Sequence, residues 1–361
     1  MRCRGEAPRR DPRFSAVGER RRERPVSPRF RASTATDRHH VGPMPSDREP
    51  SLDARSAAGR VTVIGSIMVD RVVAVPKIVP SGATVTARGI EVHPGGKGAN
   101  QAAAAALAGA AVTFAGRTGR DGAFVLEALR ECGVDTAACR VDDGPSGTAF
   151  VQVAPNGENA IAIVPEANAR FDRDDLAKAI AAVGPHSLVL LQNETALLAE
   201  TIDAAATRGA RVWLNAAPAD RGVLSLPLHR LDALIVNEHE AATLTHPELS
   251  PDRALEALAS SLPAALVIVT IGPDGAIAAR GDRRWKQPSF PVHAIDTVGC
   301  GDAFVGAFAA AISAGRAIER ALQEGCAAGA LAATRRGAIP SLPARTAIDR
   351  LCDGAGLPAR G

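Results

Sequence analysis

Gly299-Cys300-Gly301-Asp302-Ala303-Phe304-Val305-Gly306-Ala307-Phe308 is the stretch that says most about the fold and chemistry of this chain. Its first two glycines let the backbone turn tightly and approach a ligand closely, and the apolar residues after them predict a helix over 301–314. The start of such a helix offers unpaired amides and a positive dipole end, which suits a phosphoryl group. Asp302 stands in the first turn, where a carboxylate can accept a proton from a substrate hydroxyl. It is equally well explained as a helix cap.

Strands and helices alternate through most of the chain before this stretch. Short β-branched or apolar runs predict buried strands at 61–65, 112–115, 187–191, 211–214, 232–236 and 265–270. Helices are predicted at 100–107, 122–131, 172–183, 195–207, 238–245, 252–261 and 317–334. Antiparallel pieces are predicted at 72–93, 148–153 with 159–164, and 275–279 with 284–287. The alternation predicts an α/β fold, a mostly parallel sheet with helices on both faces, whose ligands lie beyond the carboxyl ends of the strands.

Composition and charge exclude several classes of protein. The chain has 361 residues, of which 46% are hydrophobic, enough for a sizeable core. Its net charge of +3 is uneven, since residues 1–60 hold 15 Arg and 8 acidic residues and the remainder has a net charge of −4, which gives no case for DNA binding. The six cysteines form no C-x-x-C pair, and no apolar run reaches the roughly 18 residues of a membrane helix. With no apolar core for a secretion signal, a cytoplasmic protein is expected.

Residues 1–58 differ from the rest of the chain. They are rich in Arg, Pro, Ser and Asp without apolar periodicity, so disorder is expected there. The segment is explained as a basic interaction arm, as a transit peptide, or as an upstream extension absent from the working protein. Its interspersed acidic residues count against a transit peptide. The third explanation is preferred, with Met44 as the start of translation and residues 59–355 as the functional domain.

Four further motifs follow predicted strands or turns, and each has an ordinary structural explanation beside a functional one. The glycines of Gly95–Gly98 allow close approach to a polyhydroxylated ligand, or they form a plain turn before a helix. Asp70 can accept hydroxyl donors, or it is a turn residue. Asn237-Glu238-His239-Glu240 offers hard oxygen ligands for Mg²⁺, or an acidic first helical turn. Thr270–Gly275 lines a nucleotide pocket, or it is a turn.

Taken in order, these motifs resemble the ribokinase family of ATP-dependent sugar and nucleoside kinases. The resemblance covers residues 61–352 and includes the run GGKGANQA at 95–102 and the run from Asp296 to Asp302. It implies a three-layer α/β/α sandwich with a small β-sheet lid, formed from about 72–93 and 148–164. It also implies transfer of the γ-phosphoryl group of ATP to D-ribose, giving D-ribose 5-phosphate, or to another sugar, a sugar acid or a nucleoside in a related family kinase.

The resemblance also implies roles for individual residues. Asp302 becomes the general base, and the backbone amides of Gly299, Cys300 and Gly301 become the anion hole. Sugar contacts fall to Met68, Asp70, Gly96, Lys97, Gly98, Asn100, Glu194 and Asp302. Contacts with ATP fall to Asn237, Thr270, Ile271, Gly272, Pro273, Asp274, Gly275 and Gly301, with Cys326 near the adenine.

Two cations and one partner are implied as well. Glu240 organises Mg²⁺ through water. A monovalent cation, usually potassium in the family, matches Asp296, Val298, Ala332, Arg335, Gly337 and Ser341, mostly through backbone carbonyls. The lid implies a homodimer.

The sequence departs from the family pattern where the sugar binds. Met68 stands where the family usually has Asn, and a thioether makes no strong hydrogen bond to a hydroxyl. A kinase of another sugar is therefore the alternative. A catalytically silent protein that senses sugars is a further alternative, but the presence of Gly299, Gly301 and Asp302 argues against it. Nucleic-acid binding through residues 1–60 is supported by charge alone.

Overall fold

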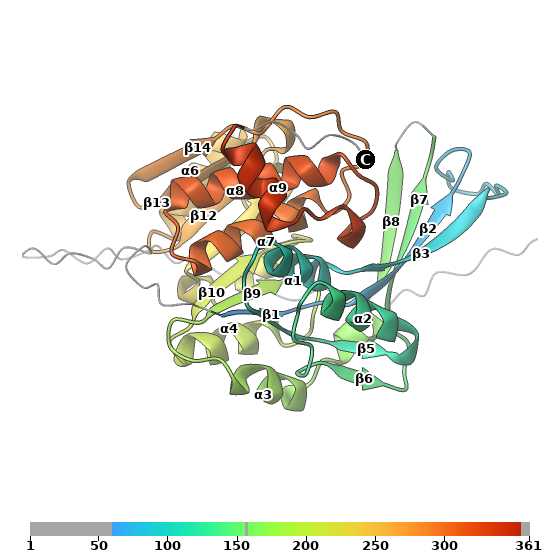
Figure 1. Cartoon of the computed structure of the whole chain (residues 1–361), viewed down its shortest axis with the longest axis horizontal. Coiled ribbons are helices and arrows are strands. Elements are labelled where there is room, and N and C mark those ends of the chain that lie inside the picture. The colour runs from blue at the N-terminus through green and yellow to red at the C-terminus, as the bar shows by residue number, and fades with distance from the viewer. Residues whose placement is uncertain (1–59, 156–157, 355–361) are drawn as a thin grey trace, which may run out of the picture. The chain divides into compact units, whose positions relative to one another are not determined.

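The computed structural model describes residues 60–155 and 158–354. The predictions for 1–58, for Asn156-Gly157 and for the end of the domain at 355 lie outside these residues. The helices are α1 (Lys97–Leu107), α2 (Ala123–Glu131), α3 (Arg173–Ala181), α4 (Leu198–Thr207), α5 (Glu238–Leu244), α6 (Pro251–Ser261), α7 (Cys300–Ser313), α8 (Ile318–Ala333) and α9 (Arg345–Cys352). They cover a central sheet (Figure 1).

The central sheet has eight strands in the order β14-β13-β12-β11-β10-β9-β1-β4. They are β1 (Val61–Ile64), β4 (Val112–Ala115), β9 (Leu188–Gln192), β10 (Arg211–Asn215), β11 (Ala233–Asn237), β12 (Leu266–Thr270), β13 (Ala276–Arg280) and β14 (Arg283–Gln287). The six strands from β4 to β12 are parallel, and the β13–β14 hairpin continues the sheet in antiparallel fashion. The prediction of an α/β fold with a mostly parallel sheet is confirmed.

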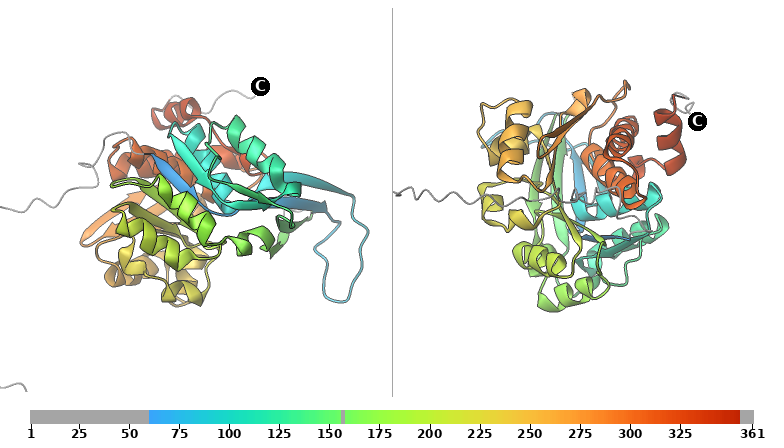
Figure 2. Two further views of the ribbon diagram at one scale, coloured as in Figure 1. Left: turned by 90° about the horizontal axis from the view of Figure 1, so that it is seen from below. Right: turned by 90° about the vertical axis from the view of Figure 1, so that its left-hand side faces the viewer.

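Each face of this sheet has its own hydrophobic core. Alternate strand residues point to opposite faces, so Val63 packs with α1, α2, α7, α8 and α9, while its neighbour Ile64 packs with α3, α4, α5 and α6. The two helical layers lie on either side of the sheet (Figure 2). Trp213 and Phe308 join the sheet to α7, with ring centroids 5.2 Å apart. The result is a three-layer α/β/α sandwich.

A second sheet stands beside the main body (Figure 1). It contains β2 (Met68–Ala74), β3 (Gly89–Gly95), β7 (Gly147–Val153) and β8 (Asn159–Val164) in the order β3-β2-β7-β8. The β2–β3 pair is antiparallel, as expected for an excursion rather than a helix, and β2 pairs with β7 in parallel. This sheet draws on both segments predicted for the lid.

Three elements were not anticipated from the sequence. The strands β5 (Arg117–Gly119) and β6 (Arg140–Asp142) form a small parallel sheet of their own. Their three-residue length leaves too little alternation for a periodic signal. The helix α9 was missed because it is short, although its apolar residues Ile348 and Leu351 are buried in the core.

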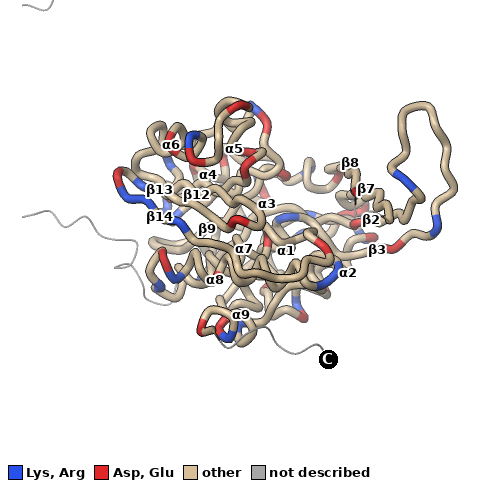
Figure 3. The backbone as a smooth tube through the Cα atoms, turned by 90° about the horizontal axis from the view of Figure 1, so that it is seen from above, with Lys and Arg blue, Asp and Glu red and all other residues tan. Residues whose placement is uncertain are grey.

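Charged residues of both signs are scattered over the described body (Figure 3). Basic residues gather on the β13–β14 hairpin at Arg280, Arg283, Arg284 and Lys286. β14 is an edge strand, and basic side chains on an edge oppose pairing with another chain, so the hairpin needs no ligand to explain its charge. Among the described residues, no helix is long and apolar enough to cross a membrane.

The close contact of α1 with α7 depends on Gly306. A Cβ atom at this position would lie 2.4 Å from Ala104 Cβ and 2.7 Å from both the Ala105 amide nitrogen and the Gln101 carbonyl oxygen. Two of these three atoms belong to the backbone and cannot rotate away. Gly306 therefore allows α7 to lie directly against α1, and this brings the first turns of both helices together.

We predict that Gly306→Ala destabilises the protein by about 1–3 kcal/mol because it overpacks this contact, although alanine is intrinsically the better helix former by about 1 kcal/mol. Gly301→Ala is the matched control in the same helix, since its Cβ would meet no atom within 4 Å. Urea unfolding measures both variants. Equal stability of the two variants would contradict the role given to Gly306.

Candidate active site

Polar side chains end the buried parallel strands at one edge of the central sheet. Gln192, Asn215, Asn237 and Thr270 are the last residues of β9, β10, β11 and β12. Parallel strands bring their carboxyl ends to the same edge, where ligands of α/β proteins bind. A pocket opens there, and its lining includes Lys97, Asn237, Glu240, Thr270, Gly299, Gly301 and Asp302. The structure thus brings together residues predicted for the sugar, for ATP and for catalysis.

The Asp302 carboxylate lies at the base of this pocket and is only 8% exposed. Asn100 Nδ2 donates to its Oδ2 atom over 2.9 Å, and Gln101 Nε2 donates to its Oδ1 atom over 2.9 Å. Both donors come from α1, and the cap residue of α7 is Gly299. The interpretation of Asp302 as a helix cap is therefore wrong. Its carboxylate is held toward the pocket by a second helix.

The amides at the start of α7 lie beside this carboxylate. Gly299 has a φ of 76°, a left-handed conformation that favours glycine. The first amides of an α-helix have no intrahelical acceptor, and the Cys300 amide reaches only the Thr297 carbonyl, at 3.3 Å. Gly301 lines the pocket with open space around its α-carbon. The turn can therefore receive an anion next to Asp302.

The glycines of the GGKG run at 95–98 allow close packing between segments of the chain. A Cβ atom at Gly95 would lie 2.1 Å from Asp70 Oδ2, one at Gly96 2.8 Å from the Ser66 carbonyl oxygen, and one at Gly98 2.5 Å from the Ser66 amide nitrogen. Tight packing within the chain thus requires glycine at these positions, and the expectation that they also admit a ligand stays a prediction. They bring the start of α1 against the β1–β2 connection, and Gly95 leaves room for the Asp70 carboxylate.

Glu194 closes the other side of the start of α1. Its Oε2 atom accepts hydrogen bonds from Ser66 Oγ and, over 3.2 Å, from the Lys97 amide. Ser66 Oγ in turn accepts from the Gly98 amide over 3.2 Å. The start of α1 thus binds the half-buried carboxylate of Glu194. Glu194 and Lys97, both predicted to contact the sugar, lie next to each other.

Four carboxylates surround the Lys97 side chain. Burial acts to lower the pKa of Lys97, but the charges of Asp302, Glu194, Glu240 and Asp70 together raise it. Burial also raises the pKa of Glu194. For Asp70, burial and the charges of Glu194 and Asp302 raise the pKa to about 7. The lysine remains charged and partly balances a strongly acidic site.

Asn168 connects the segment before Asp70 to the loop that contains Glu194. Its Oδ1 atom accepts from the Ile67 amide over 3.0 Å, and its Nδ2 atom donates to the Ile67 carbonyl over 2.9 Å. Its backbone carbonyl accepts from the Ala196 amide over 3.1 Å, close to Glu194 in the chain. Asn168 is fully buried. It therefore fixes the strand that carries Asp70 relative to the loop that carries Glu194.

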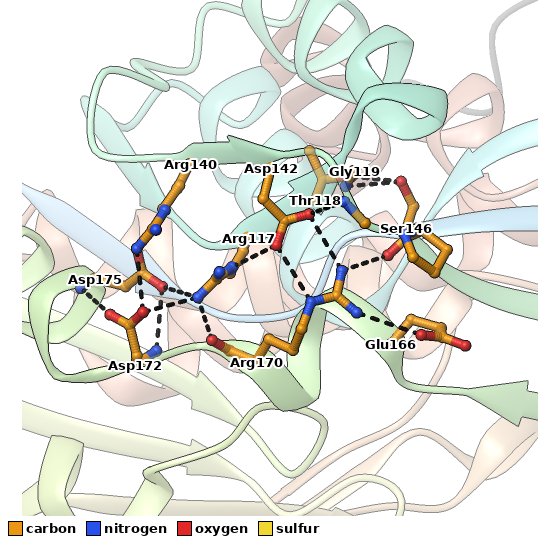
Figure 4. Close-up of polar contacts among 12 residues, drawn as sticks. Arg117, Thr118, Gly119, Arg140, Asp142, Ser146, Glu166, Arg170, Asp172 and Asp175 are labelled. Atoms are coloured by element: carbon orange, nitrogen blue, oxygen red, sulfur yellow. Dashed lines mark hydrogen bonds and ion pairs between the residues drawn. The ribbon is translucent and has the colours of Figure 1, made fainter.

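A cluster of partly buried ion pairs anchors the segment that contains Asn168 (Figure 4). Arg117 donates to Asp142 over 2.8 Å, to Asp172 over 2.9 Å and to the Arg170 carbonyl. Arg170 itself pairs with Asp142 over 3.2 Å. The Arg170 hydrogen bond holds the pKa of Asp142 below its usual value. The cluster thus holds Arg170 and Asp172, which follow Asn168 closely in the chain, against β5 and β6.

Met68 faces the same side of the lid sheet as Asp70, since the two residues are two apart in β2. Its side chain is 2% exposed, and Asn168 Nδ2 lies 3.5 Å from its Sδ atom. A Cβ atom at Gly147 would lie 2.6 Å from the same sulfur. Met68 therefore places a fixed thioether where the family usually has an amide.

The residues predicted for ATP are only partly in the pocket. Asn237 and Thr270 line it. Ile271–Gly275 form the turn after Thr270; its 3₁₀ turn η6 (Gly272–Asp274) is exposed, whereas Gly275 is buried. Cys326 does not line the pocket. It is buried in α8 with Sγ 3.9 Å from the Gln287 carbonyl oxygen.

Glu240 was predicted to organise Mg²⁺ and faces the same pocket. Glu240 Oε2 accepts from the Asn237 amide over 2.8 Å, and Asn237 Oδ1 accepts from the Glu240 amide over 2.8 Å. This reciprocal cap uses one carboxylate oxygen and leaves the other. Burial raises the pKa of Glu240. A single half-buried carboxylate fits Mg²⁺ bound through water and substrate phosphates, not a site made of protein ligands alone. Within the described residues, no group of three or more His, Cys, Asp or Glu could hold a metal ion.

The residues predicted for a monovalent cation lie before α7 and from the end of α8 to Ser341, two segments that Asp296 joins. Asp296 Oδ1 accepts from the Val298 amide over 3.0 Å, and Oδ2 accepts from the Gly337 amide over 2.9 Å. The Ala332 carbonyl accepts from the Arg335 amide over 3.0 Å, and Ser341 Oγ donates to the Ala338 carbonyl over 2.8 Å. The second segment also touches the turn at Gly299, where a Cβ atom would lie 3.0 Å from Ala338 Cα. Asp296 and Ala338 thus bring both segments against the turn that begins α7.

Some residues of the site were missed from the sequence alone. Ser66, Gln101, Asn168, Gln192 and Asn215 received no role, although all are buried. A signal was present for Gln192 and Asn215, because each is the polar last residue of an otherwise mostly apolar buried strand. Asn168 lies in a 3₁₀ turn, η3 (Glu166–Arg170), and nothing in its neighbourhood marked it.

Fold and pocket together define a kinase of small molecules, in which helix-start amides and a carboxylate meet at the edge of a parallel sheet. The chain belongs to the pfkB family of carbohydrate kinases, whose profile matches residues 58–345. It is an ATP-dependent sugar kinase.

Individual relatives show the same likeness. A ribokinase of Haemophilus influenzae is 35% identical over 294 residues, covering 79% of this chain and 95% of the relative. A deoxyribokinase of Salmonella typhi is 32% identical, covering 78% of this chain and 95% of the relative. The structure of an Arabidopsis thaliana ribokinase complexed with ribose and ATP aligns with a TM-score of 0.72 at 32% identity, covering 82% of this chain and 99% of that one.

We predict that Asp70→Asn stabilises the free protein in a pH-dependent way. The raised pKa of Asp70, about 7, means that the folded state holds this proton more tightly than the unfolded chain does. The resulting stabilisation is complete below the unfolded pKa of about 4 and is lost as the pH rises through about 7. Asp70→Asn should therefore raise the melting temperature at pH 8, relative to its effect at pH 5, by about 2 °C or more.

The control for this comparison is Asp282→Asn, at an exposed turn position. Thermal unfolding at the two pH values without sugar gives the readout. An Asp70→Asn effect that is the same at pH 5 and pH 8 would show that Asp70 does not carry the buried charge.

Proposed function

We propose that this enzyme phosphorylates D-ribose to D-ribose 5-phosphate, with Asp302 as the general base. The observation that carries the proposal is the Asp302 carboxylate, held by two amide donors in the first turn of α7, next to the amides that begin this helix. The ribokinase relatives support ribose as the acceptor.

The proposed step moves one proton and one phosphoryl group. The acceptor hydroxyl gives its proton to the Asp302 carboxylate as its oxygen bonds to the γ-phosphorus. The bond from that phosphorus to the bridging oxygen breaks, and ADP leaves with the electron pair. The amides of Gly299, Cys300 and Gly301 stabilise the charge on the transferred group.

The sugar is proposed to lie between Asp70, Lys97, Asn100 and Glu194, near Gly96, Gly98 and Met68. Asn100 Oδ1 is buried without a hydrogen-bond partner among the described residues, so it can accept from a sugar hydroxyl. Asp70 and Glu194 are acceptors when ionised. Three acceptors close to Lys97 and Asp302, which line the pocket, suit a molecule with several hydroxyl groups. ATP is proposed to contact Asn237, the turn Thr270–Gly275 and Gly301, with Cys326 behind the adenine.

Two cations complete the proposal. Mg²⁺ accompanies ATP and neutralises phosphate charge when bound, with Glu240 oriented toward it by Asn237. Potassium is proposed between the segments that Asp296 joins, next to the backbone carbonyls of Val298, Ala332, Arg335 and Gly337 and to Ser341. There Asp296 keeps the turn at Gly299 in the shape that presents its amides.

The test of the base is Asp302→Asn, assayed by ADP release with ATP, Mg²⁺ and ribose. We predict a decrease in kcat of at least about 10²-fold, since the variant cannot accept the hydroxyl proton. Unchanged ATP affinity and melting temperature would show that the variant is folded. A smaller decrease in kcat would remove Asp302 from the role of base. The same assay with pentoses, hexoses, sugar acids and nucleosides tests the acceptor, and faster turnover of a hexose or a nucleoside would overturn ribose.

A second candidate acceptor, deoxyribose, is favoured by one specific observation. The fixed thioether of Met68 lies on the Asp70 face, where it offers no strong hydrogen bond. A sugar with one hydroxyl fewer loses nothing there. The deoxyribokinase relative supports this candidate.

We predict that Met68→Asn raises the ratio of kcat/KM for ribose over deoxyribose by about 2–10-fold, the value of one hydrogen bond of about 0.5–1.5 kcal/mol. Val69→Thr, on the opposite face of β2, is the control and should leave the ratio unchanged. Initial rates with both sugars give the answer. An unchanged ratio in Met68→Asn would show that residue 68 does not determine the preference between ribose and deoxyribose.

The lid sheet is proposed to form a homodimer contact. Its described strands expose Ile90, Val92 and Phe150, at 60%, 48% and 44%. In the strand registers, Val92 and Phe150 both lie opposite Arg71, and Ile90 lies opposite Val73, so the three share one face. An apolar face of this kind is suited to burial against a second copy.

A further inference from the structure

Gln101 sits at the centre of a buried network of amides behind the Asp302 carboxylate. Its Nε2 atom donates to Asp302 Oδ1 over 2.9 Å and to Asn215 Oδ1 over 2.8 Å. Its Oε1 atom accepts from Gln192 Nε2 over 2.7 Å. Gln101 and Gln192 are both 0% exposed. The network therefore joins α1, α7, β9 and β10 at a point that solvent does not reach.

The orientation of every amide in this network follows from one backbone carbonyl. The Ile235 carbonyl can only accept, and Asn215 Nδ2 donates to it over 3.0 Å. The Oδ1 atom of Asn215 therefore faces Gln101. Because this oxygen can only accept a hydrogen bond, Gln101 must donate to it through Nε2. The same Gln101 Nε2 atom faces Asp302, and its Oε1 atom is left to face Gln192. The donor presented to Asp302 is thus imposed by the strands of the sheet.

Gln101 and its neighbour Asn100 hold the same carboxylate in different ways. Asn100 Oδ1 has no partner among the described residues and is free for a ligand, whereas both terminal atoms of Gln101 are engaged with protein groups. Gln101 also has no exposed surface. Asn100 is suited to touch substrate, and Gln101 is suited only to act on Asp302.

We propose that Gln101 is a positioning residue for the reaction: it fixes the plane of the Asp302 carboxylate so that the lone pairs not used by the two amides face the acceptor hydroxyl. This inference rests on the proposed role of Asp302 as the base. Without Gln101, the carboxylate keeps one donor and can rotate about its last torsion, which is broad for Asp. Misplacement of a reacting group on the scale of 1 Å costs about 10²-fold in rate.

The test is Gln101→Met, which keeps the length of the side chain and removes its donor. Steady-state kinetics with ATP and ribose should show kcat lower by about 10–10²-fold, with KM for both substrates within about 3-fold of the wild-type values. Thr201→Val is the matched control, because Thr201 is 2% exposed and its hydroxyl hydrogen-bonds within α4, away from the site. It should keep the wild-type kcat.

A double-mutant cycle with Asp302→Asn separates this inference from the proposed function. If Gln101 acts through Asp302, Gln101→Met lowers kcat in the wild-type background and has no further effect in the Asp302→Asn background. An equal loss in both backgrounds, or none in either, would overturn the positioning role. A wild-type kcat in Asp302→Asn alone would instead overturn the proposed base.

Gln192→Met provides a second variant if Gln101→Met does not fold. It leaves the Gln101 donor in place and removes the hydrogen bond from β9 that holds the Gln101 amide alongside the one to Asn215 of β10. We expect kcat to fall by about 3–10-fold at unchanged KM, and only while Asp302 is present. No change in kcat would contradict the orientation of Gln101 by the sheet.

Discussion

The backbone of α7 lies so close to α1 at Gly306 that one added methyl group would overlap the Gln101 carbonyl and the Ala105 amide. This contact decides where Asp302 can be. Asn100 and Gln101 both come from the adjoining turn of α1, and each donates to one oxygen of the carboxylate. A helix pair set slightly farther apart would leave Asp302 with solvent or its own helix as partner. The proposed base is therefore a product of helix packing as much as of its own sequence position.

This arrangement has an unfavourable electrostatic consequence, because it places several carboxylates close together. Asp70, Glu194, Glu240 and Asp302 surround Lys97, and burial raises the pKa of Asp70 to about 7. Buried charges of one sign destabilise a fold unless they are paired. Under the proposed function these carboxylates are retained because a polyhydroxylated substrate needs several hydrogen-bond acceptors. Rigid supports surround the site, namely the Arg117 ion-pair cluster and the bidentate grip of Asn168 on Ile67.

Much of the fold was predictable from the sequence because strands such as 187–191 and 265–270 are continuous apolar runs with strong local signals. The helix start at Gly299–Asp302 and the polar residues after strands were also readable. The hydrogen bonds between residues far apart in the sequence could not be predicted. Asn100 and Asp302 are 202 residues apart, and Gln101 and Gln192 are 91 apart, so no local pattern links them. The packing of Gly95 against Asp70 and of Gly98 against Ser66 was hidden for the same reason, since 25 and 32 residues separate the partners.

The single-turnover rate of sugar phosphate formation in Gly306→Ala, with ATP and ribose saturating, tests most directly whether the α1–α7 contact sets the catalytic geometry. Rapid quenching isolates the chemical step from product release. If the contact positions Asp302, the step slows by about 10-fold or more while ATP affinity stays the same. A wild-type rate in a folded variant would contradict the account, because the two helices could then separate without disturbing the base.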